Sequence, residues 1–189
     1  MRVLTRRAEL ADLCNDEGIV SAVEVGTHRA GFAAAFLERF RGTLRCVDPY
    51  LPYPGDALLW PASREPDGTR RREDDLDAAR KALRRFGARA EIRTLTSAVG
   101  AANCEAEGWF PGFVYLDGDH REEAVLRDID LWWPLVAPGG IMAGHDWEDC
   151  PEWQAGIRRA VRARLGEPEL IPETGQPWSW WVRKPGVPA

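Results

Sequence analysis

Two short stretches, Tyr115-Leu116-Asp117-Gly118-Asp119-His120 and His145-Asp146-Trp147, each carry acidic and imidazole groups directly after an apolar run. The runs, 112–116 and 140–143, are typical of buried strands, and a stretch with helical spacing lies between them. Strands joined by a helix run parallel, so both stretches are expected at the carboxyl edge of one sheet, where α/β proteins bind ligands. Five polar side chains are thus predicted to converge there: Asp117, Asp119, His120, His145 and Asp146.

The chain on either side of these stretches alternates strand-like and helix-like segments. Two closing strand-like segments are separated by a short gap that contains Gly175, which is typical of an antiparallel hairpin. The sequence predicts an α/β fold, a three-layer Rossmann-like sandwich whose seven-stranded, mostly parallel sheet ends in a C-terminal antiparallel hairpin. Strands are expected over 19–25, 44–47, 90–95, 112–116, 141–143, 169–171 and 178–182.

Length predicts a single domain over 1–189, with an N-terminal helix within 1–18. Residues 51–75 interrupt the alternation with four prolines, two glycines and a basic run at 70–72. Because long irregular loops are usually functional or disordered, we interpret this segment as a lid or substrate-facing insertion. A plain exposed loop is the alternative.

Charge and composition exclude some classes of protein. A net charge of −5 argues against a nucleic-acid partner, which requires a basic face. No apolar run approaches the roughly 20 residues of a membrane span, and no signal peptide is recognisable. Four widely spaced cysteines without a CxxC pair are typical of reduced thiols, so we expect a cytoplasmic protein.

Acidic residues also follow the first two strands. Glu24 and Gly26 end strand one, where glycine lets a ligand approach the backbone, and Asp48 ends strand two, where a carboxylate can accept hydrogen bonds from ribose hydroxyls. This order favours a ligand that contains a nucleoside. The absence of GxGxxG argues against ordinary NAD binding.

The cluster after the later strands predicts a cation site. Asp117 and Asp146, with His145 or Asp119 in reach, offer hard oxygen ligands and one imidazole, which suits Mg²⁺ or Mn²⁺. The alternative is that Asp119 or His120 only caps the following helix. Aromatic residues near strand ends, Trp147 and Tyr50 among them, are candidates for an acceptor pocket.

These residues resemble a known family. Four segments are similar to class I S-adenosylmethionine-dependent methyltransferases, in particular the bacterial branch of macrocin-type and other sugar O-methyltransferases. They are Glu24-Val-Gly-Thr, Asp48-Pro-Tyr, Leu116-Asp-Gly-Asp-His, and the segment from Leu131-Trp-Trp-Pro to Gly144-His-Asp-Trp. The resemblance covers roughly residues 19–183.

The resemblance implies a role for each matching residue. S-adenosylmethionine would be the methyl donor, Mg²⁺ or Mn²⁺ would assist, and the acceptor would be a hydroxyl of a small sugar or phenolic molecule. Asp119 would be the catalytic base. The donor would be bound by Glu24, Gly26, Thr27, Asp48, Ser97 and Asp117, and the metal by Asp117, His145 and Asp146.

The chain departs from the family pattern near strand one. Ala30 stands where a second glycine is expected, and Phe32 stands where a small or hydroxyl residue is common. Two alternatives therefore stay open: metal-independent methyl transfer, and a domain that binds a nucleoside without turnover.

Overall fold

The strands at the middle of the sheet are buried on both faces. The structure is a computed structural model that describes residues 4–51, 72–147, 152–172 and 178–186. All four residues of β4 are buried, as are four of the five residues of β1. Parallel strands covered by helices on both faces have this continuous apolar character, which explains why the sequence predicts them clearly.

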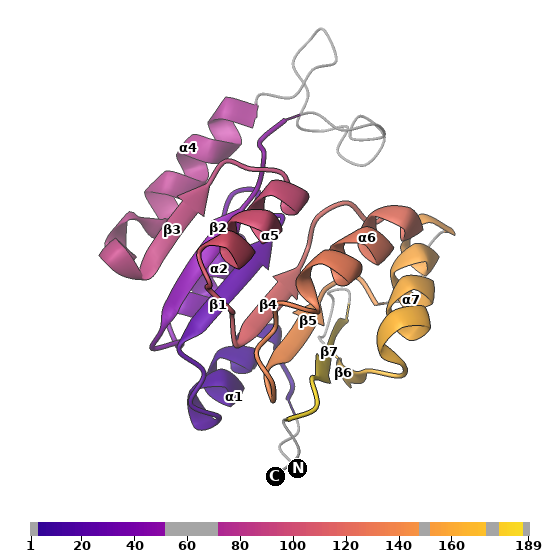
Figure 1. Ribbon diagram of the computed structural model, residues 1–189. Coiled ribbons are helices and arrows are strands. Elements are labelled where there is room, and N and C mark those ends of the chain that lie inside the picture. Colours follow the sequence, from indigo (N-terminus) through magenta and orange to yellow (C-terminus); the bar gives the residue numbers. More distant parts are fainter. Residues whose placement is uncertain (1–3, 52–71, 148–151, 173–177, 187–189) are drawn as a thin grey trace, which may run out of the picture.

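The described residues form one seven-stranded sheet in the order β3-β2-β1-β4-β5-β7-β6 (Figure 1). The first five strands are parallel, and β7 joins β5 and β6 in antiparallel pairs. The predicted seven-stranded sheet with a C-terminal antiparallel hairpin is confirmed. The strands are β1 (Ser21–Val25), β2 (Thr43–Val47), β3 (Ala90–Arg93), β4 (Phe113–Leu116), β5 (Ile141–Gly144), β6 (Glu169–Ile171) and β7 (Ser179–Arg183).

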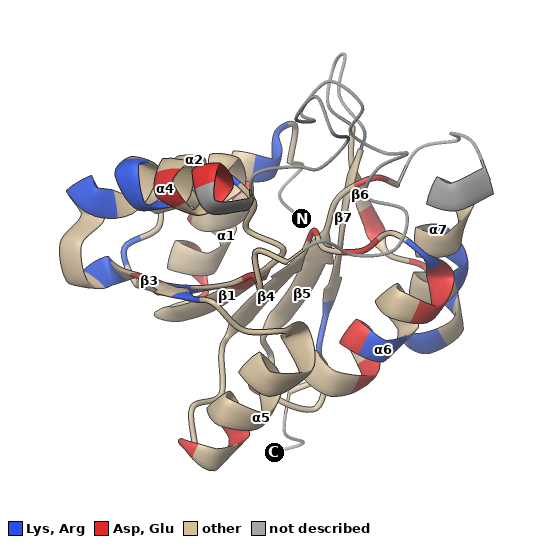
Figure 2. Cartoon of the chain, turned by 90° about the horizontal axis from the view of Figure 1, so that it is seen from above, with Lys and Arg blue, Asp and Glu red and all other residues tan. Residues whose placement is uncertain are grey.

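Helices cover both faces of this sheet. Viewed from above in Figure 2, α1, α2 and α4 lie on one side and α5 and α6 on the other. Residues of α7 pack in the same buried cluster as those of α6. The helices are α1 (Leu10–Asp16), α2 (Gly31–Leu37), α4 (Arg72–Leu83), α5 (Ser97–Ala106), α6 (Glu122–Trp132) and α7 (Glu152–Leu165), with 3₁₀ turns η1 (Arg7–Glu9) and η3 (Arg84–Arg89).

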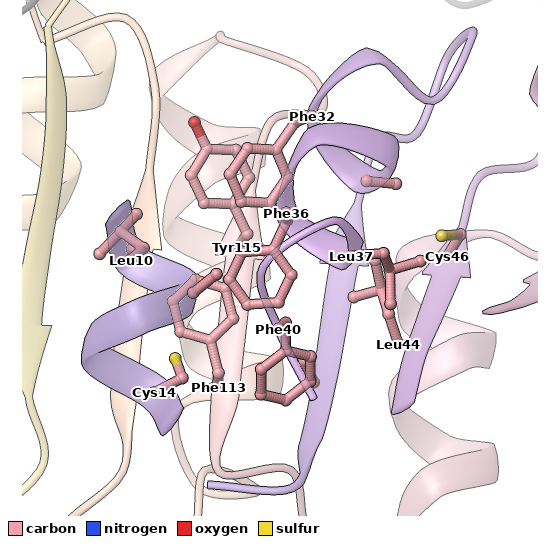
Figure 3. Packing of buried hydrophobic residues seen from close by; sticks show 14 of the residues in the cluster. Leu10, Cys14, Phe32, Phe36, Leu37, Phe40, Leu44, Cys46, Phe113 and Tyr115 are labelled. Carbon is pink, nitrogen blue, oxygen red and sulfur yellow. The ribbon is translucent and has the colours of Figure 1, made fainter. Parts of the chain in front are cut away.

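Side chains alternate between the two faces along each strand, which gives two cores. Phe113 and Tyr115 of β4 enter the core beneath α1 and α2, whereas Val114 and Leu116 enter the opposite core. In the first core Phe32 of α2 stacks on Tyr115, with ring centroids 3.6 Å apart (Figure 3). This stack fixes the start of α2 against the fourth strand.

The predicted lid lies mostly outside the described residues, because 52–71 are not among them. Its last four residues, 72–75, form the start of α4 rather than a loop, and Asp75 there is buried. The predicted N-terminal helix is the turn η1 followed by α1. Among the described residues, no helix has the length and apolar character needed to span a membrane.

Candidate active site

The ends of β4 and β5 bring the acidic and imidazole groups together, as the topology predicts. Leu116 pairs with Gly144 in the parallel ladder, so the residues that follow them leave the sheet side by side. His120 Nε2 lies 3.3 Å from Asp146 Oδ2 and 3.9 Å from Asp117 Oδ1. His145 Nδ1 lies 3.3 Å from the same Asp146 oxygen. The carboxyl edge therefore carries two carboxylates and two imidazoles in contact. We call Asp117, His120, Asp146 and His145 the array.

A cation could be shared by Asp117, His120 and Asp146, whose ligand atoms all lie within 4.8 Å of one another. The histidine in this set is His120, whereas the sequence predicts His145 as the ligand. His145 approaches Asp146 through Nδ1, and its buried Nε2 has no hydrogen-bond partner among the described residues. Its role as a ligand stays a prediction. His120 could have been chosen from sequence, since it lies three residues after Asp117 in the same loop.

The array shifts the pKa values of its members. Burial lowers the pKa of His120, but the carboxylates of Asp117 and Asp146 outweigh burial, and the pKa is raised. Burial raises the pKa of Asp146, but the neighbouring imidazoles outweigh it, and the pKa is lowered. Asp146 also has a φ of 58°, and this left-handed turn lets Asp146 face both histidines.

Asp119, the predicted base, contacts Arg121 in this structure. Its carboxylate accepts hydrogen bonds from the Arg121 backbone N–H at 3.0 Å and from the guanidinium Nε at 2.9 Å. Burial raises the pKa of Asp119, but Arg121 outweighs burial and lowers it overall. This backbone bond goes to Arg121, the N-cap residue of α6, and not to an N–H of the helix's first turn, so Asp119 does not cap the helix. The role of Asp119 as a base stays a prediction.

Glu24 and Gly26 lie at the carboxyl end of β1, the strand that pairs with β4 on the side opposite β5. Glu24 is 1% exposed, and burial, together with the Asp117 carboxylate, raises its pKa well above the ordinary value. Gly26 has a φ of 89°, and a Cβ there would lie 2.2 Å from the Asp117 carbonyl oxygen. Only glycine allows β1 and β4 to approach so closely at this edge.

Asp48 holds two loops by their backbones. Its Oδ2 accepts a hydrogen bond from the His28 N–H at 2.8 Å, and its Oδ1 accepts one from the Tyr50 N–H at 2.7 Å. Both donors have left-handed backbones, with φ of 50° and 49°. We call this arrangement the Asp48 clamp. Tyr50 is 7% exposed and belongs to the core beside α2, so it does not present its ring as an open acceptor surface.

The two departures from the family pattern have structural explanations. Ala30 has a φ of 61°, which is the left-handed conformation that glycine adopts most easily, so the turn before α2 is kept without a glycine. Phe32 is 5% exposed and stacks on Tyr115, so its ring fills the core. Neither residue blocks the turn after β1.

Ser97, the predicted adenine contact, begins α5. Its Oγ accepts a hydrogen bond from Trp132 Nε1 at 2.9 Å. Asp128 of α6 lies close to it, and burial raises the pKa of Asp128 to about 6 although the Ser97 hydroxyl opposes the rise. The sequence of α6 does not predict that Asp128 is buried, because an aspartate in a helix is usually exposed. Ser97 as an adenine contact stays a prediction.

A small pocket adjoins the array between the sheet and the helices α6 and α7. Trp147, predicted to line an acceptor pocket, is 4% exposed and packs in the core on this side of the sheet. Arg162 lies over its ring. The pocket itself is lined by Leu116, Gly118, Asp119, His120, Val125, Asp128, His145, Ile157 and Trp180.

Comparison with known proteins identifies the family. The sequence profile of a family described as "Methyltransferase domain" matches residues 23–147, which include both strand ends described above. The chain belongs to this methyltransferase family. The resemblance to S-adenosylmethionine-dependent methyltransferases is thereby confirmed.

Solved structures of methyltransferases have the same fold. An O-methyltransferase from Bacillus cereus, in complex with SAH, is 16% identical with a TM-score of 0.65, and the match covers 94% of this chain and 80% of that one. TomG from Streptomyces achromogenes, an O-methyltransferase involved in tomaymycin synthesis and solved with SAM, is 12% identical, with a TM-score of 0.65 and coverage of 94% and 78%. The calicheamicin methyltransferase CalS11 is 16% identical, with a TM-score of 0.60 and coverage of 95% and 80%.

Proposed function

We propose that this methyltransferase moves the methyl group of S-adenosylmethionine to a hydroxyl oxygen of a small molecule, assisted by a divalent cation. The observation that carries the proposal is the array, with Asp117, His120 and Asp146 as candidate ligands, beside the turn that begins at Gly26. Methyl transfer requires a donor and an acceptor to meet at one point, and β1 and β4 are neighbours in the sheet. The similar solved structures described above are O-methyltransferases, which supports oxygen as the acceptor atom.

The residues fit a hard divalent cation. Two carboxylates and one imidazole suit Mg²⁺ or Mn²⁺ completed by waters, and Asp146 has the lowered pKa that a ligand needs at neutral pH. A cation held there would lower the pKa of an acceptor hydroxyl. His145, which contacts Asp146, would act as a further ligand beside these three or orient that carboxylate from outside.

The chain's own groups would position both reactants. Glu24 and Thr27 would bind the amino-acid end of the donor, and Asp48 would accept hydrogen bonds from the ribose through lone pairs that the Asp48 clamp does not use. Asp119, once turned away from Arg121, would take the proton that the acceptor hydroxyl loses as the oxygen attacks the methyl carbon. The sulfonium already activates the methyl group, so position and electrostatics are what the protein supplies.

Two alternatives make different predictions about cation binding. In metal-independent transfer the array would only form hydrogen bonds, and in a binding domain the donor would be held without turnover. The raised pKa of His120 would favour an imidazolium between two carboxylates, which is the arrangement expected without a cation. Direct measurement of cation and donor binding separates these cases.

The test measures Mn²⁺ binding by electron paramagnetic resonance and S-adenosylhomocysteine binding by calorimetry. We expect wild-type protein to bind both. Asp146→Asn should lose the Mn²⁺ site and keep its S-adenosylhomocysteine affinity within about twofold, because the donor residues lie on other strands. Asp130→Asn is the matched control, since Asp130 is an exposed carboxylate paired with Arg164.

Each other outcome contradicts one part of the proposal. Wild-type protein that binds S-adenosylhomocysteine but no Mn²⁺, even with the nucleoside present, would favour metal-independent transfer. Equal loss of Mn²⁺ binding in Asp130→Asn would mean that general surface charge, rather than the array, holds the cation. Absence of S-adenosylhomocysteine binding in wild-type protein would contradict the donor assignment.

A further inference from the structure

One large apolar side chain is exposed close to the array. Trp178 lies directly before β7 and is 38% exposed, whereas Trp180, two residues further on, is 1% exposed and belongs to the core that contains residues of α6 and α7. Single exposed apolar residues are common, so exposure alone carries no conclusion. The position of Trp178 in the sheet is what gives it significance.

The backbone of Trp178 is held beside the end of β5. The antiparallel ladder between β5 and β7 ends with Gly144 opposite Trp180. Two residues further, the paired chains reach Asp146 on one side and Trp178 on the other. Here the Trp147 N–H donates to the Trp178 carbonyl oxygen at 2.9 Å, so the two chains stay side by side beyond the ladder. Trp178 is therefore a neighbour of the array by its backbone position.

The other large apolar side chains that are exposed in the described part of the chain lie elsewhere. Val20 and Phe110 precede β1 and β4, at the amino edge of the sheet, and Leu51 follows β2. Val99 lies in the first turn of α5, which follows β3. Within the described ranges, Trp178 is thus the exposed apolar side chain of this size that borders the end of β5.

The order of the strands places Trp178 on the side of the array away from the methyl donor. In the sheet, β2 and β1, which carry the predicted donor residues, are followed by β4 and β5, whose ends carry the array, and then by β7 (Figure 1). Methyl transfer requires the attacking oxygen to be aligned with the methyl carbon and the sulfur. The acceptor therefore approaches from the side opposite the donor, which is the side of β5 and β7.

An indole suits an acceptor whose ring is apolar on its faces and hydroxylated at its edge. The indole face is a large, rigid apolar surface, and its N–H is a hydrogen-bond donor. We propose that the Trp178 indole packs against the ring of the methyl acceptor, a hydroxylated sugar or phenolic ring, while one hydroxyl of that ring reaches the array. This proposal rests on the proposed function, because it presumes that the acceptor hydroxyl is methylated at the array. Trp178 then has the role that the sequence predicts for Trp147, which is buried.

The test uses two ring probes, methyl α-rhamnopyranoside for sugars and catechol for phenols. The chain has nine tryptophans, and ¹⁵N labelling of their indoles gives one N–H side-chain signal for each, among which Trp178→Phe identifies that of Trp178. With S-adenosylhomocysteine and Mg²⁺ present, we expect one probe to shift the Trp178 signal more than the signals of the other tryptophans. The probe that does so distinguishes a sugar from a phenolic acceptor.

Variants then measure what the ring contributes to binding. Trp178→Ala should raise the dissociation constant of the effective probe at least about fivefold, because a stacked ring contact is lost. Trp178→Phe keeps an aromatic face, so it should raise that constant less. The dissociation constant of S-adenosylhomocysteine should stay within about twofold in both variants, because the predicted donor residues lie on other strands.

Phe110→Ala is the matched control. Phe110 is an aromatic residue that is 53% exposed, but it lies at the opposite edge of the sheet, before β4. Its loss should leave the dissociation constants of the probe and of S-adenosylhomocysteine unchanged. Melting temperatures of all proteins establish that the variants are folded.

The remaining results overturn the proposal in distinguishable ways. Wild-type protein that binds S-adenosylhomocysteine, but whose Trp178 signal responds to neither probe, would overturn this inference and leave the proposed function standing. Equal weakening in Trp178→Phe and Trp178→Ala would mean that the N–H rather than the face of the ring binds the probe, and equal weakening in Phe110→Ala would mean that the loss is unspecific. Wild-type protein that does not bind S-adenosylhomocysteine would overturn the proposed function together with this inference.

Discussion

At the scale of single residues, Gly26 has the least freedom to change. Alanine there would force a Cβ to within 2.2 Å of the Asp117 carbonyl oxygen and would have to adopt a φ of 89°. We expect Gly26→Ala to lower the free energy of unfolding by about 3 kcal/mol, because steric overlap and backbone strain add. Urea denaturation measures this change.

Gly31 provides the control for this substitution. It begins α2, it has no positive φ, and a Cβ there would meet nothing within 4 Å. Gly31→Ala should be neutral or should stabilise the protein by up to about 1 kcal/mol through helix propensity. Equal stability of the Gly26→Ala and Gly31→Ala proteins would mean that β1 and β4 do not approach as described.

Glu24 predicts a pH dependence of stability. Its pKa is raised by burial and by Asp117, so the folded chain keeps a proton where the unfolded chain, with a pKa of 4.5, has lost it. The free energy of unfolding should therefore fall as pH rises from about 4.5 to the raised pKa, by about 1.4 kcal/mol for each pH unit. Glu24→Gln should remove this fall, so it should gain stability relative to wild type as pH rises.

Urea denaturation of both proteins between pH 4.5 and pH 8 tests this expectation. A constant difference in the free energy of unfolding across that range would mean that Glu24 ionises normally in the folded protein.

At the scale of elements, the end of α6 depends on one lysine. Lys184 follows β7, and its Nζ donates to the carbonyl oxygens of Trp133, Pro134 and Val136 at 2.8, 3.0 and 2.6 Å. These bonds use all three ammonium donors and place a positive charge at a helix C-terminus. Lys184→Met should cost about 3 kcal/mol of stability, measured by urea denaturation, because the carbonyls lose charged partners. Lys81→Met, at an exposed position in α4, should change stability by less than about 0.5 kcal/mol.

The sheet was predictable at this scale and the turns that follow it were not. Apolar runs and helical spacing suffice to predict the strands and the proximity of Asp117 to Asp146. Parallel strands all end at the same edge of the sheet, so the residues that follow neighbouring strands lie close together. The left-handed turn at Ala30 leaves no sequence signal, because alanine usually avoids that conformation. Aspartate adopts it more readily, but most aspartates do not, so the residue type alone does not predict the turn at Asp146. The contact of Asp119 with Arg121 depends on side-chain rotamers, and the burial of Trp147 depends on how the last helix packs.

At the scale of the whole molecule, one sheet runs through two cores. Because every described strand belongs to that sheet, we propose that the chain unfolds as a single domain. Calorimetry should show one transition, with a ratio of van't Hoff to calorimetric enthalpy near one, and S-adenosylhomocysteine should raise its midpoint. Two separate transitions would contradict the single domain.

The Asp48 clamp also has a consequence for motion. The loop after β1 and the loop after β2 each donate a hydrogen bond to one oxygen of the Asp48 carboxylate. If either loop moves away, its own bond breaks, and the carboxylate is no longer held in the orientation that the other loop's bond requires. If opening occurs on the microsecond-to-millisecond timescale, the amides of His28 and Tyr50 should report one common exchange rate in relaxation-dispersion experiments. The two loops would then open as a single gate, and entry of the methyl donor would follow one rate constant rather than two.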